Sequence, residues 1–189
     1  TVSDLKDLAS SPLARRIKAL AASGTPVIGI CGGYQMLGER VVDSGVEGGR
    51  AETIEGLGLL PVETRFGAYE KTTRQVEKRV TGSGPILGPL QGSKVKGYEI
   101  HMGQTVSCSP AFEDDGCAAA SGLVFWTYLH GLFENRGLTD ALLGYACRRK
   151  GLEYSPGDGP EDPYESLARV IEPCIDMKAF LDIIERGVD

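Results

Sequence analysis

The sequence lacks the features that mark membrane, nucleic-acid and nucleotide-binding proteins. Its 189 residues contain no apolar run of the roughly 18 residues that a membrane-spanning helix needs. Acidic residues outnumber basic ones, 26 to 20, and the net charge of −6 disfavours nucleic acid or an anionic membrane as the main partner. No G-x-x-x-x-G-K-[ST] phosphate loop occurs, so we expect no ATP site in this chain. Apolar residues at 41% and charged residues at 24% are typical of a globular domain.

Histidine is scarce, and the cysteines follow no metal-binding or redox pattern. The five cysteines stand at wide spacings without a C-x-x-C pair, so we expect neither a zinc ribbon nor any other metal site. No secretory signal is present, and we therefore expect reduced thiols and a cytoplasmic protein. His101 and His130 are the two histidines, so a base that works near neutral pH has two candidates. The chain starts without methionine, and we expect it to be a piece of a longer polypeptide.

A cysteine at the end of a short apolar run is the feature around which the sequence is organised. Residues 26–30 are rich in β-branched side chains and predict a buried parallel strand. Cys31 follows at once, then Gly32 and Gly33, then a stretch that can be helical. A strand, a reactive residue and a sharp turn into a helix form a nucleophile elbow, as described for serine in G-x-S-x-G. We expect this turn to present Cys31 at the carboxyl end of the sheet and the helix N-terminus to favour its thiolate. The alternative is a buried structural cysteine.

His130 is the candidate base for this nucleophile. It comes directly after residues 123–129, the most β-prone run in the chain. Because sites in open α/β sheets form outside the carboxyl ends of strands, Cys31 and His130 can share one rim. A cysteine and a histidine are the minimum for acyl transfer. His101 is the weaker candidate, either a packed histidine beside Tyr98 or part of the rim.

The order of helix, buried strand, several further strands and then helices predicts an α/β domain with a mixed sheet. We expect one domain over residues 1–189. Ser3 or Asp4 can cap the first helix, Ser11 the second and Asp176 the last. The predicted helices cover residues 3–9, 12–23, 32–40, 135–150, 163–172 and 176–187. The predicted strands cover residues 26–30, 71–81, 94–106, 116–121 and 123–129, and another begins within 56–62. Residues 42–55, 82–92 and 151–163 are predicted to be loops or turns.

Three segments in order resemble class I, triad-type glutamine amidotransferases. Residues 29–35 (GICGGYQ) are similar to the family's G-x-C-x-G-x-Q nucleophile motif. Residues 97–103 (GYEIHMG) resemble a segment typical of the cobyric acid synthase branch. Residues 127–133 (TYLHGLF) resemble the segment with the family's catalytic histidine.

The resemblance implies a flavodoxin-like class I amidotransferase domain with a mixed central sheet and flanking helices, without its first strands. Cys31 and His130 would be catalytic, the Gly32 N–H would be an oxyanion donor, and Gln35 would belong to the glutamine pocket. The resemblance implies glutamine as substrate and an upstream synthetase domain of the same polypeptide as partner. That absent domain would use ATP and Mg²⁺ to activate carboxylates of a corrinoid, an adenosylated cobyrinic acid diamide. No cofactor is expected in this chain, nor a nucleic-acid or membrane partner.

Two departures from the family pattern leave alternatives open. Triad-type members usually have Glu two residues after the histidine, where this chain has Leu132. Glu99 and Glu134 are candidates for the third group by proximity in sequence. The Pro-Gly turn that supplies a second oxyanion donor is also missing, so the isolated chain is expected to be weakly active or inactive. The alternative functions are the glutaminase subunit of a peptidoglycan-precursor amidating ligase and a non-catalytic scaffold.

Overall fold

The computed structural model describes residues 1–69, 71–106, 109–157 and 162–187. The chain forms two compact units, Thr1–Tyr154 and Ser155–Asp189, where the sequence predicted one domain over residues 1–189.

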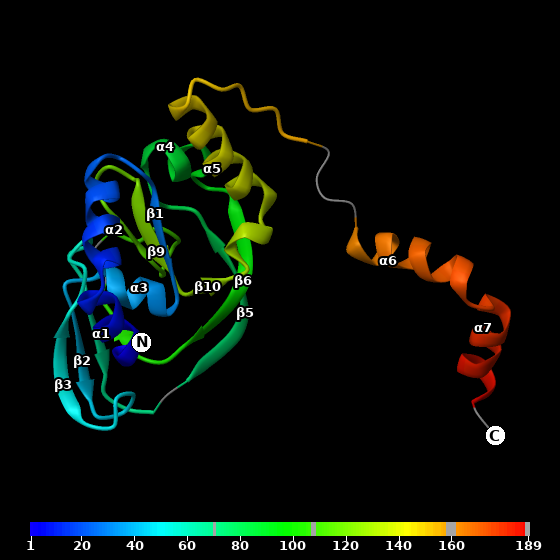
Figure 1. Ribbon diagram of the computed structural model, residues 1–189, viewed down its shortest axis with the longest axis horizontal. Coiled ribbons are helices and arrows are strands. Elements are labelled where there is room, and N and C mark those ends of the chain that lie inside the picture. Colours follow the sequence, from blue (N-terminus) through cyan, green and yellow to red (C-terminus); the bar gives the residue numbers. More distant parts are fainter. Residues whose placement is uncertain (70, 107–108, 158–161, 188–189) are drawn as a thin grey trace. The chain divides into compact units, whose positions relative to one another are not determined.

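The first unit combines short strands with flanking helices (Figure 1). Its helices are α1 (Val2–Ser10), α2 (Pro12–Ala22), α3 (Gly32–Leu37), α4 (Gly84–Leu87) and α5 (Arg136–Arg149), with 3₁₀ turns at Gly88–Leu90 and Leu132–Glu134. Its strands are β1 (Val27–Ile30), β2 (Arg40–Ser44), β3 (Ala51–Glu55), β4 (Glu63–Phe66), β5 (Thr72–Arg79), β6 (Lys94–His101), β7 (Gln104–Thr105), β8 (Cys117–Ala118), β9 (Val124–Thr127) and β10 (Leu129–His130).

The strands form three sheets of mixed direction. Their orders are β1-β9-β8, β10-β6-β5 and β3-β2-β4-β7. The pairs β1–β9 and β2–β4 are parallel and the others antiparallel, which confirms the predicted mixed α/β class. The chain passes from the first sheet to the second at Tyr128, between β9 and β10. The strands are therefore shared among three small sheets, where a single central sheet was expected.

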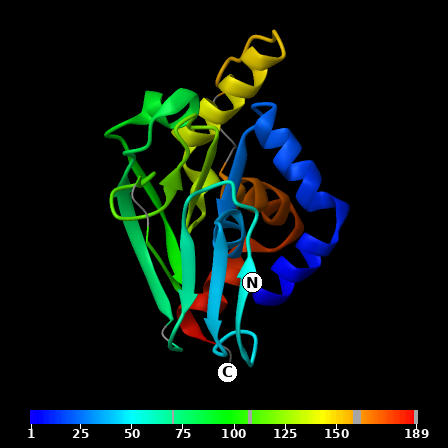
Figure 2. The same cartoon turned by 90° about the vertical axis from the view of Figure 1, so that its left-hand side faces the viewer.

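The two N-terminal helices follow the predicted boundaries closely. Ser11 caps α2, with its side chain accepting a hydrogen bond from the Leu13 N–H and Pro12 at the first helical position. Gly24 follows α2 with a φ of 78°, the left-handed conformation that ends many helices. The predicted cap of α1 is wrong, because the N-cap residue is Thr1 rather than Ser3 or Asp4. In Figure 2, α1 and α2 lie on one side of this unit and β5 and β6 on the other.

Residues 42–55, predicted to be a loop, form most of the antiparallel pair β2–β3. Asp43 stabilises the connection, because its carboxylate accepts hydrogen bonds from four successive backbone N–H groups, those of residues 45–48. Burial on its own would raise the pKa of Asp43, but these four donors lower it overall. The acidic, glycine-rich composition that suggested a loop is thus the composition of a hairpin connection.

Two further segments differ from the prediction. The strand expected to begin within residues 56–62 starts later, as β4, after Pro61. Residues 82–92, predicted as turns, form α4 and a 3₁₀ turn, each with a proline in its first turn. Both differences concern boundaries near proline and glycine, which local pattern alone places poorly.

Strand β9 separates two of the three apolar clusters in this unit. All four of its residues are buried. Phe125 packs with Leu129 and Leu138 in one cluster, while Trp126 packs with Tyr34 in another. Because successive side chains of a strand point to opposite faces, β9 has both faces covered.

A methyl group at Gly29 is expected to destabilise this unit. A Cβ there would lie 2.8 Å from Leu37 Cδ1 and 2.9 Å from the Gly33 carbonyl oxygen, where β1 packs against α3. Gly29→Ala should therefore lower the free energy of unfolding by about 1–3 kcal/mol, as overpacking does. Gly33→Ala is the matched control, because a Cβ at Gly33 meets nothing within 4 Å. Urea denaturation of both variants tests this, and equal stabilities would contradict the packing of β1 on α3.

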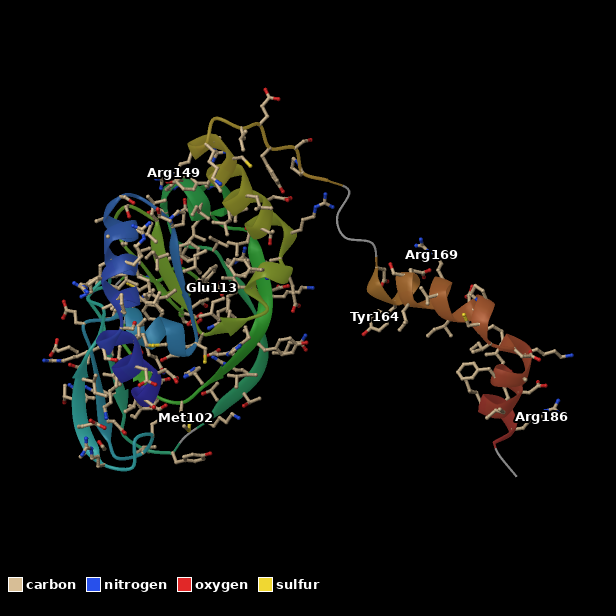
Figure 3. All side chains as sticks on the ribbon, in the orientation of Figure 1. Met102, Glu113, Arg149, Tyr164, Arg169 and Arg186 are labelled. Atoms are coloured by element: carbon tan, nitrogen blue, oxygen red, sulfur yellow. The ribbon has the colours of Figure 1, made fainter. Side chains whose placement is uncertain are left out.

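The second unit contains α6 (Pro163–Ile171), a 3₁₀ turn at Glu172–Cys174 and α7 (Met177–Arg186). Asp162 and Asp176 cap the two helices through their side chains, the latter as predicted. Figure 3 labels Tyr164 and Arg169 on α6 and Arg186 on α7. Apolar side chains of both helices are exposed, including Tyr164 and Ile184. In the described part of the chain, no helix is long and apolar enough to cross a membrane.

Candidate active site

Cys31 occupies a strained position between β1 and α3. Its N–H donates to the Thr127 carbonyl at 3.0 Å, which extends the parallel pairing of β1 with β9 by one residue. Its φ is 53° and its ψ −113°, a conformation uncommon for a residue with a side chain. Helix α3 begins at the next residue. The strand, the strained cysteine and the immediate helix are the geometry of a nucleophile elbow, as the sequence predicted.

His130 reaches the same place from β10. The parallel pairing of β1 and β9 brings Ile30 opposite Thr127, so the segments that follow these two strands leave the sheet side by side. Cys31 Sγ donates a hydrogen bond to the carbonyl oxygen of Ile100 at 3.3 Å, and His130 Nε2 lies 3.3 Å from the same oxygen. The structure thus brings together the two residues predicted to be catalytic, with one carbonyl between them.

The thiol of Cys31 is less acidic than the sequence predicted. Burial raises its pKa, and the hydrogen bond from the Gly32 N–H only partly offsets that effect. The expectation of a favoured thiolate is therefore wrong for this arrangement. The structure places the N–H of Gly32 at the sulfur atom, where it can also stabilise developing negative charge.

Gln35, predicted to line the glutamine pocket, is buried and makes several hydrogen bonds. Its Nε2 donates to the Met102 carbonyl at 2.9 Å and to the Tyr128 hydroxyl at 3.2 Å. Its Oε1 accepts from the Thr1 hydroxyl at 2.8 Å. Gln35 thus ties α3 to the segment after β6 and to the residue between β9 and β10.

His101 forms a pair with Glu99. Nε2 of His101 lies 3.1 Å from Glu99 Oε1, and Nδ1 lies 3.1 Å from the Gly103 carbonyl oxygen. The imidazole stacks on the ring of Tyr128, with centroids 3.7 Å apart and planes 12° apart. His101 is therefore a neighbour of the site through Tyr128, and Glu99 contacts His101 rather than His130.

No carboxylate reaches His130 from position 132, where the family usually has Glu, or from Glu134. The side chain of Leu132 is buried in an apolar cluster. The carboxylate of Glu134 lies over Gly131, about 3.3 Å from where a Cβ would stand there. Among the residues that the structure describes, no hydrogen bond or ion pair joins Glu134 to His130. The group that contacts the imidazole of His130 is the Ile100 carbonyl.

Asp115 is a structural residue of the site that sequence reasoning missed. It accepts hydrogen bonds from the Thr127 hydroxyl and, at 3.2 Å, from the Tyr128 N–H, where the chain passes between sheets. Asp115 stands in a run of acidic residues that is typical of an exposed loop, so no sequence signal distinguished it as a buried residue of the site. Burial raises the pKa of Asp115 more than these two donors lower it.

The neighbouring carboxylates Asp114 and Asp115 should affect stability with opposite pH dependence. The raised pKa of Asp115 means that the folded state holds its proton more tightly, so its contribution to stability is lost as pH rises above its ordinary value. A hydrogen bond from Lys78 lowers the pKa of Asp114, so its contribution is lost as pH falls below that value. From about pH 3 to pH 7, Asp115→Asn should gain thermal stability relative to the parent chain, and Asp114→Asn should lose it. Melting curves of the three proteins test this, and the same trend for both variants would contradict the assignment.

Two cavities meet at His101 and Gln104. One, of about 370 Å³, is also lined by Arg65 and Thr72. The other, of about 360 Å³, is also lined by Tyr128 and by several carboxylates. In the described part of the chain, no group of three or more potential ligands among His, Cys, Asp and Glu could hold a metal ion.

A strained strand-end cysteine beside a histidine, on an α/β fold, is an arrangement suited to cysteine-dependent acyl transfer. Comparison with protein families agrees, since the model of the CobB/CobQ-like glutamine amidotransferase domain matches residues 1–138. The chain belongs to this family.

The similar curated proteins are named probable cobyric acid synthases. The protein of Methanocella arvoryzae is 61% identical over 98% of this chain, that of Archaeoglobus fulgidus 53% over 94%, and that of Methanosarcina barkeri 52% over 97%. The chain spans 36–38% of the length of these relatives. They favour the cobyric acid synthase branch over the peptidoglycan-precursor ligase and the scaffold.

Proposed function

We propose that this chain hydrolyses the side-chain amide of glutamine, with Cys31 as nucleophile and His130 as general base. The observation that carries the proposal is the convergence of Cys31 Sγ and His130 Nε2 on the Ile100 carbonyl oxygen. Both groups stand at strand ends, where the backbone rather than a mobile loop sets their positions. Such placement gives the reacting groups the fixed geometry that acyl transfer needs.

The reaction follows from these two side chains. His130 takes the thiol proton of Cys31, and Sγ attacks the amide carbon of glutamine. His130 then gives this proton to the departing nitrogen, so the C–N bond breaks, ammonia leaves and a glutamyl thioester remains. Water attacks the thioester, and His130 transfers a proton from water to Sγ, which releases glutamate and restores the thiol. The N–H of Gly32 would stabilise the oxyanion in both halves.

The catalytic group would be a pair rather than a triad. Since Leu132 is buried in the core, its position supplies no carboxylate, and the contact that the structure gives His130 is that of Nε2, on the side of Cys31, with the Ile100 carbonyl. A carbonyl can orient an imidazole, but it carries no full charge to stabilise the imidazolium that forms. The raised pKa of the Cys31 thiol adds to this effect. We therefore expect slow hydrolysis by the chain alone.

Replacing His130 should reveal how much of the rate depends on proton transfer. His130→Gln should lower kcat by about 10²–10⁴-fold, the usual contribution of a general base. The measurement is the initial rate of glutamate and ammonia formation from L-glutamine, with D-glutamine and L-asparagine as comparison substrates. Equal amounts of glutamate and ammonia are expected from L-glutamine. Hydrolysis at the same rate by the parent chain and His130→Gln would contradict the assigned base.

The ammonia would serve the amidation of corrinoid carboxylates, as the names of the relatives suggest. In this proposal, a synthetase region outside the chain activates the carboxylates with ATP and Mg²⁺ in the cytoplasm, and an adenosylated cobyrinic acid diamide is the acceptor. Glutamine labelled with ¹⁵N in its side-chain amide, supplied to the complete synthase, should transfer the label to the corrinoid. Label that appears only as free ammonia would contradict this acceptor.

A further inference from the structure

Backbone carbonyl groups of the segment from Ile100 to Gly103 contact the side chains of Cys31, His130 and Gln35. The Ile100 carbonyl faces Cys31 and His130, and the Met102 carbonyl accepts from Gln35. Figure 3 labels Met102 in this segment. The position of these backbone groups therefore sets the position of the thiol and of the Gln35 amide.

The side chain of His101 fixes this segment from both ends. Its Nε2 contacts Glu99, two residues before it, and its Nδ1 contacts the carbonyl of Gly103, two residues after it. The ring also stacks on Tyr128, whose hydroxyl accepts from Gln35. One imidazole thus connects strand β6, the turn after it and the residue that joins the two sheets.

Glu99 is itself held in place by charge. Arg74 lies opposite it on β5 and approaches Oε2 to within 2.8 Å, while the buried Lys78 approaches to 3.4 Å. Burial would raise the pKa of Glu99, but the contacts with His101, Lys78 and Arg74 lower it overall. The carboxylate that contacts His101 therefore has a fixed position and a full negative charge.

We propose that His101, held between Glu99 and Gly103, is a positioning residue for glutamine hydrolysis. It acts through the Ile100 carbonyl, which keeps the Cys31 thiol and the His130 imidazole at one point, and through Met102, which orients Gln35. The inference rests on the proposed glutaminase function for its catalytic consequence, but the effect on the Cys31 thiol depends on geometry alone.

If His101 has this role, replacing it should change the rate of Cys31 alkylation and the rate of glutamine hydrolysis in opposite directions. The hydrogen bond to the Ile100 carbonyl stabilises the protonated thiol, so its loss should make Cys31 more reactive toward a small neutral electrophile such as iodoacetamide. The same loss should slow glutamine hydrolysis, because Cys31 and His130 are no longer held together. A residue that only supports folding would not produce this combination in a folded protein.

The test compares His101→Phe, which keeps a ring against Tyr128 without its hydrogen bonds, with His101→Gln, which keeps a donor toward Glu99. Lys96→Gln is the control, because it lies on the same strand with its side chain 77% exposed. Each full chain is treated with iodoacetamide well below its melting temperature, and the rates at Cys31 and at the buried Cys117 are read by peptide mass spectrometry. Cys117 reports general loosening of the fold.

His101→Phe should raise the Cys31 rate several-fold without changing that of Cys117, and should lower kcat by about 10–100-fold with a KM within about threefold. His101→Gln should fall between it and the parent chain, and Lys96→Gln should match the parent. An unchanged Cys31 rate, a parallel rise at Cys117 or an unchanged kcat would each overturn the proposal. If the parent chain hydrolyses no glutamine, a selective rise at Cys31 still supports the positioning role, and the proposed function alone fails.

Discussion

Cys31→Ser should lower kcat for glutamine hydrolysis by about 10⁴-fold or more, as loss of the nucleophile does in enzymes that act through a covalent intermediate. The hydroxyl fits the space of the thiol, but its proton is far harder to remove. His130, with the Ile100 carbonyl as its contact and no carboxylate hydrogen-bonded to it among the described residues, is a weak activator of an alcohol. Glutamate release measured over hours tests this expectation.

Cys174→Ser is the matched control for that experiment. Cys174 is an exposed free cysteine in the second unit, so its replacement should change neither hydrolysis nor folding. Cys31→Ser should keep the melting temperature of the parent chain within a few degrees, because the two side chains are nearly the same size. Substantial hydrolysis by Cys31→Ser, with the parent's KM, would show that the chemistry does not pass through Cys31.

Gly97→Ala should be the most damaging of the small substitutions near the site. A Cβ at Gly97 would stand 2.4 Å from the carbonyl oxygen of His130 and 3.5 Å from Leu129 Cβ, so β10 and β6 could not pair as they do. We expect a loss of about 3 kcal/mol in the free energy of unfolding, at the upper end for overpacking. A shift of β10 away from β6 would also move His130 away from the Ile100 carbonyl, so kcat should fall by about 10²-fold or more.

Gly67→Ala is the control for this prediction, since a Cβ at Gly67 meets nothing within 4 Å. Chemical denaturation gives the stabilities of both variants, and glutamine hydrolysis is measured where both are fully folded. A Gly97→Ala protein with the parent's stability and rate would mean that β10 does not lie against β6 at this point. The glycine that opens the residue 97–103 segment is thus explained by the close approach of two strands.

The sequence predicted the central part of the site because its signals are local. An apolar run, a cysteine and two glycines specify a strand, a sharp turn and a helix, and β1, Cys31 and α3 follow that order. The placement of His130 beside Cys31 required one further step, that both residues end parallel strands of one sheet. That step holds for Cys31, which directly follows β1, but β9 ends at Thr127 and His130 ends β10, which pairs antiparallel with β6 in another sheet.

Other features depend on contacts that local pattern does not encode. Residues 42–55 look like a loop because their strands are short, and the contacts that hold their connection, such as the hydrogen bonds to the Asp43 carboxylate, exist only in the folded chain. The role of Asp115 depends on its distance from Thr127 and Tyr128, which only the folded chain determines. The raised pKa of Cys31 comes from burial, which outweighs the effect of the turn into α3.

The most direct test of the central claim is covalent labelling with diazo-oxo-norleucine, an electrophile that resembles glutamine. The labelled residue is identified by peptide mass spectrometry on the full chain, with and without excess glutamine. We predict an adduct on Cys31 alone among the five cysteines, formed more slowly when glutamine is present. Labelling spread over several cysteines, or labelling of Cys31 that glutamine does not slow, would contradict a glutamine site at this cysteine.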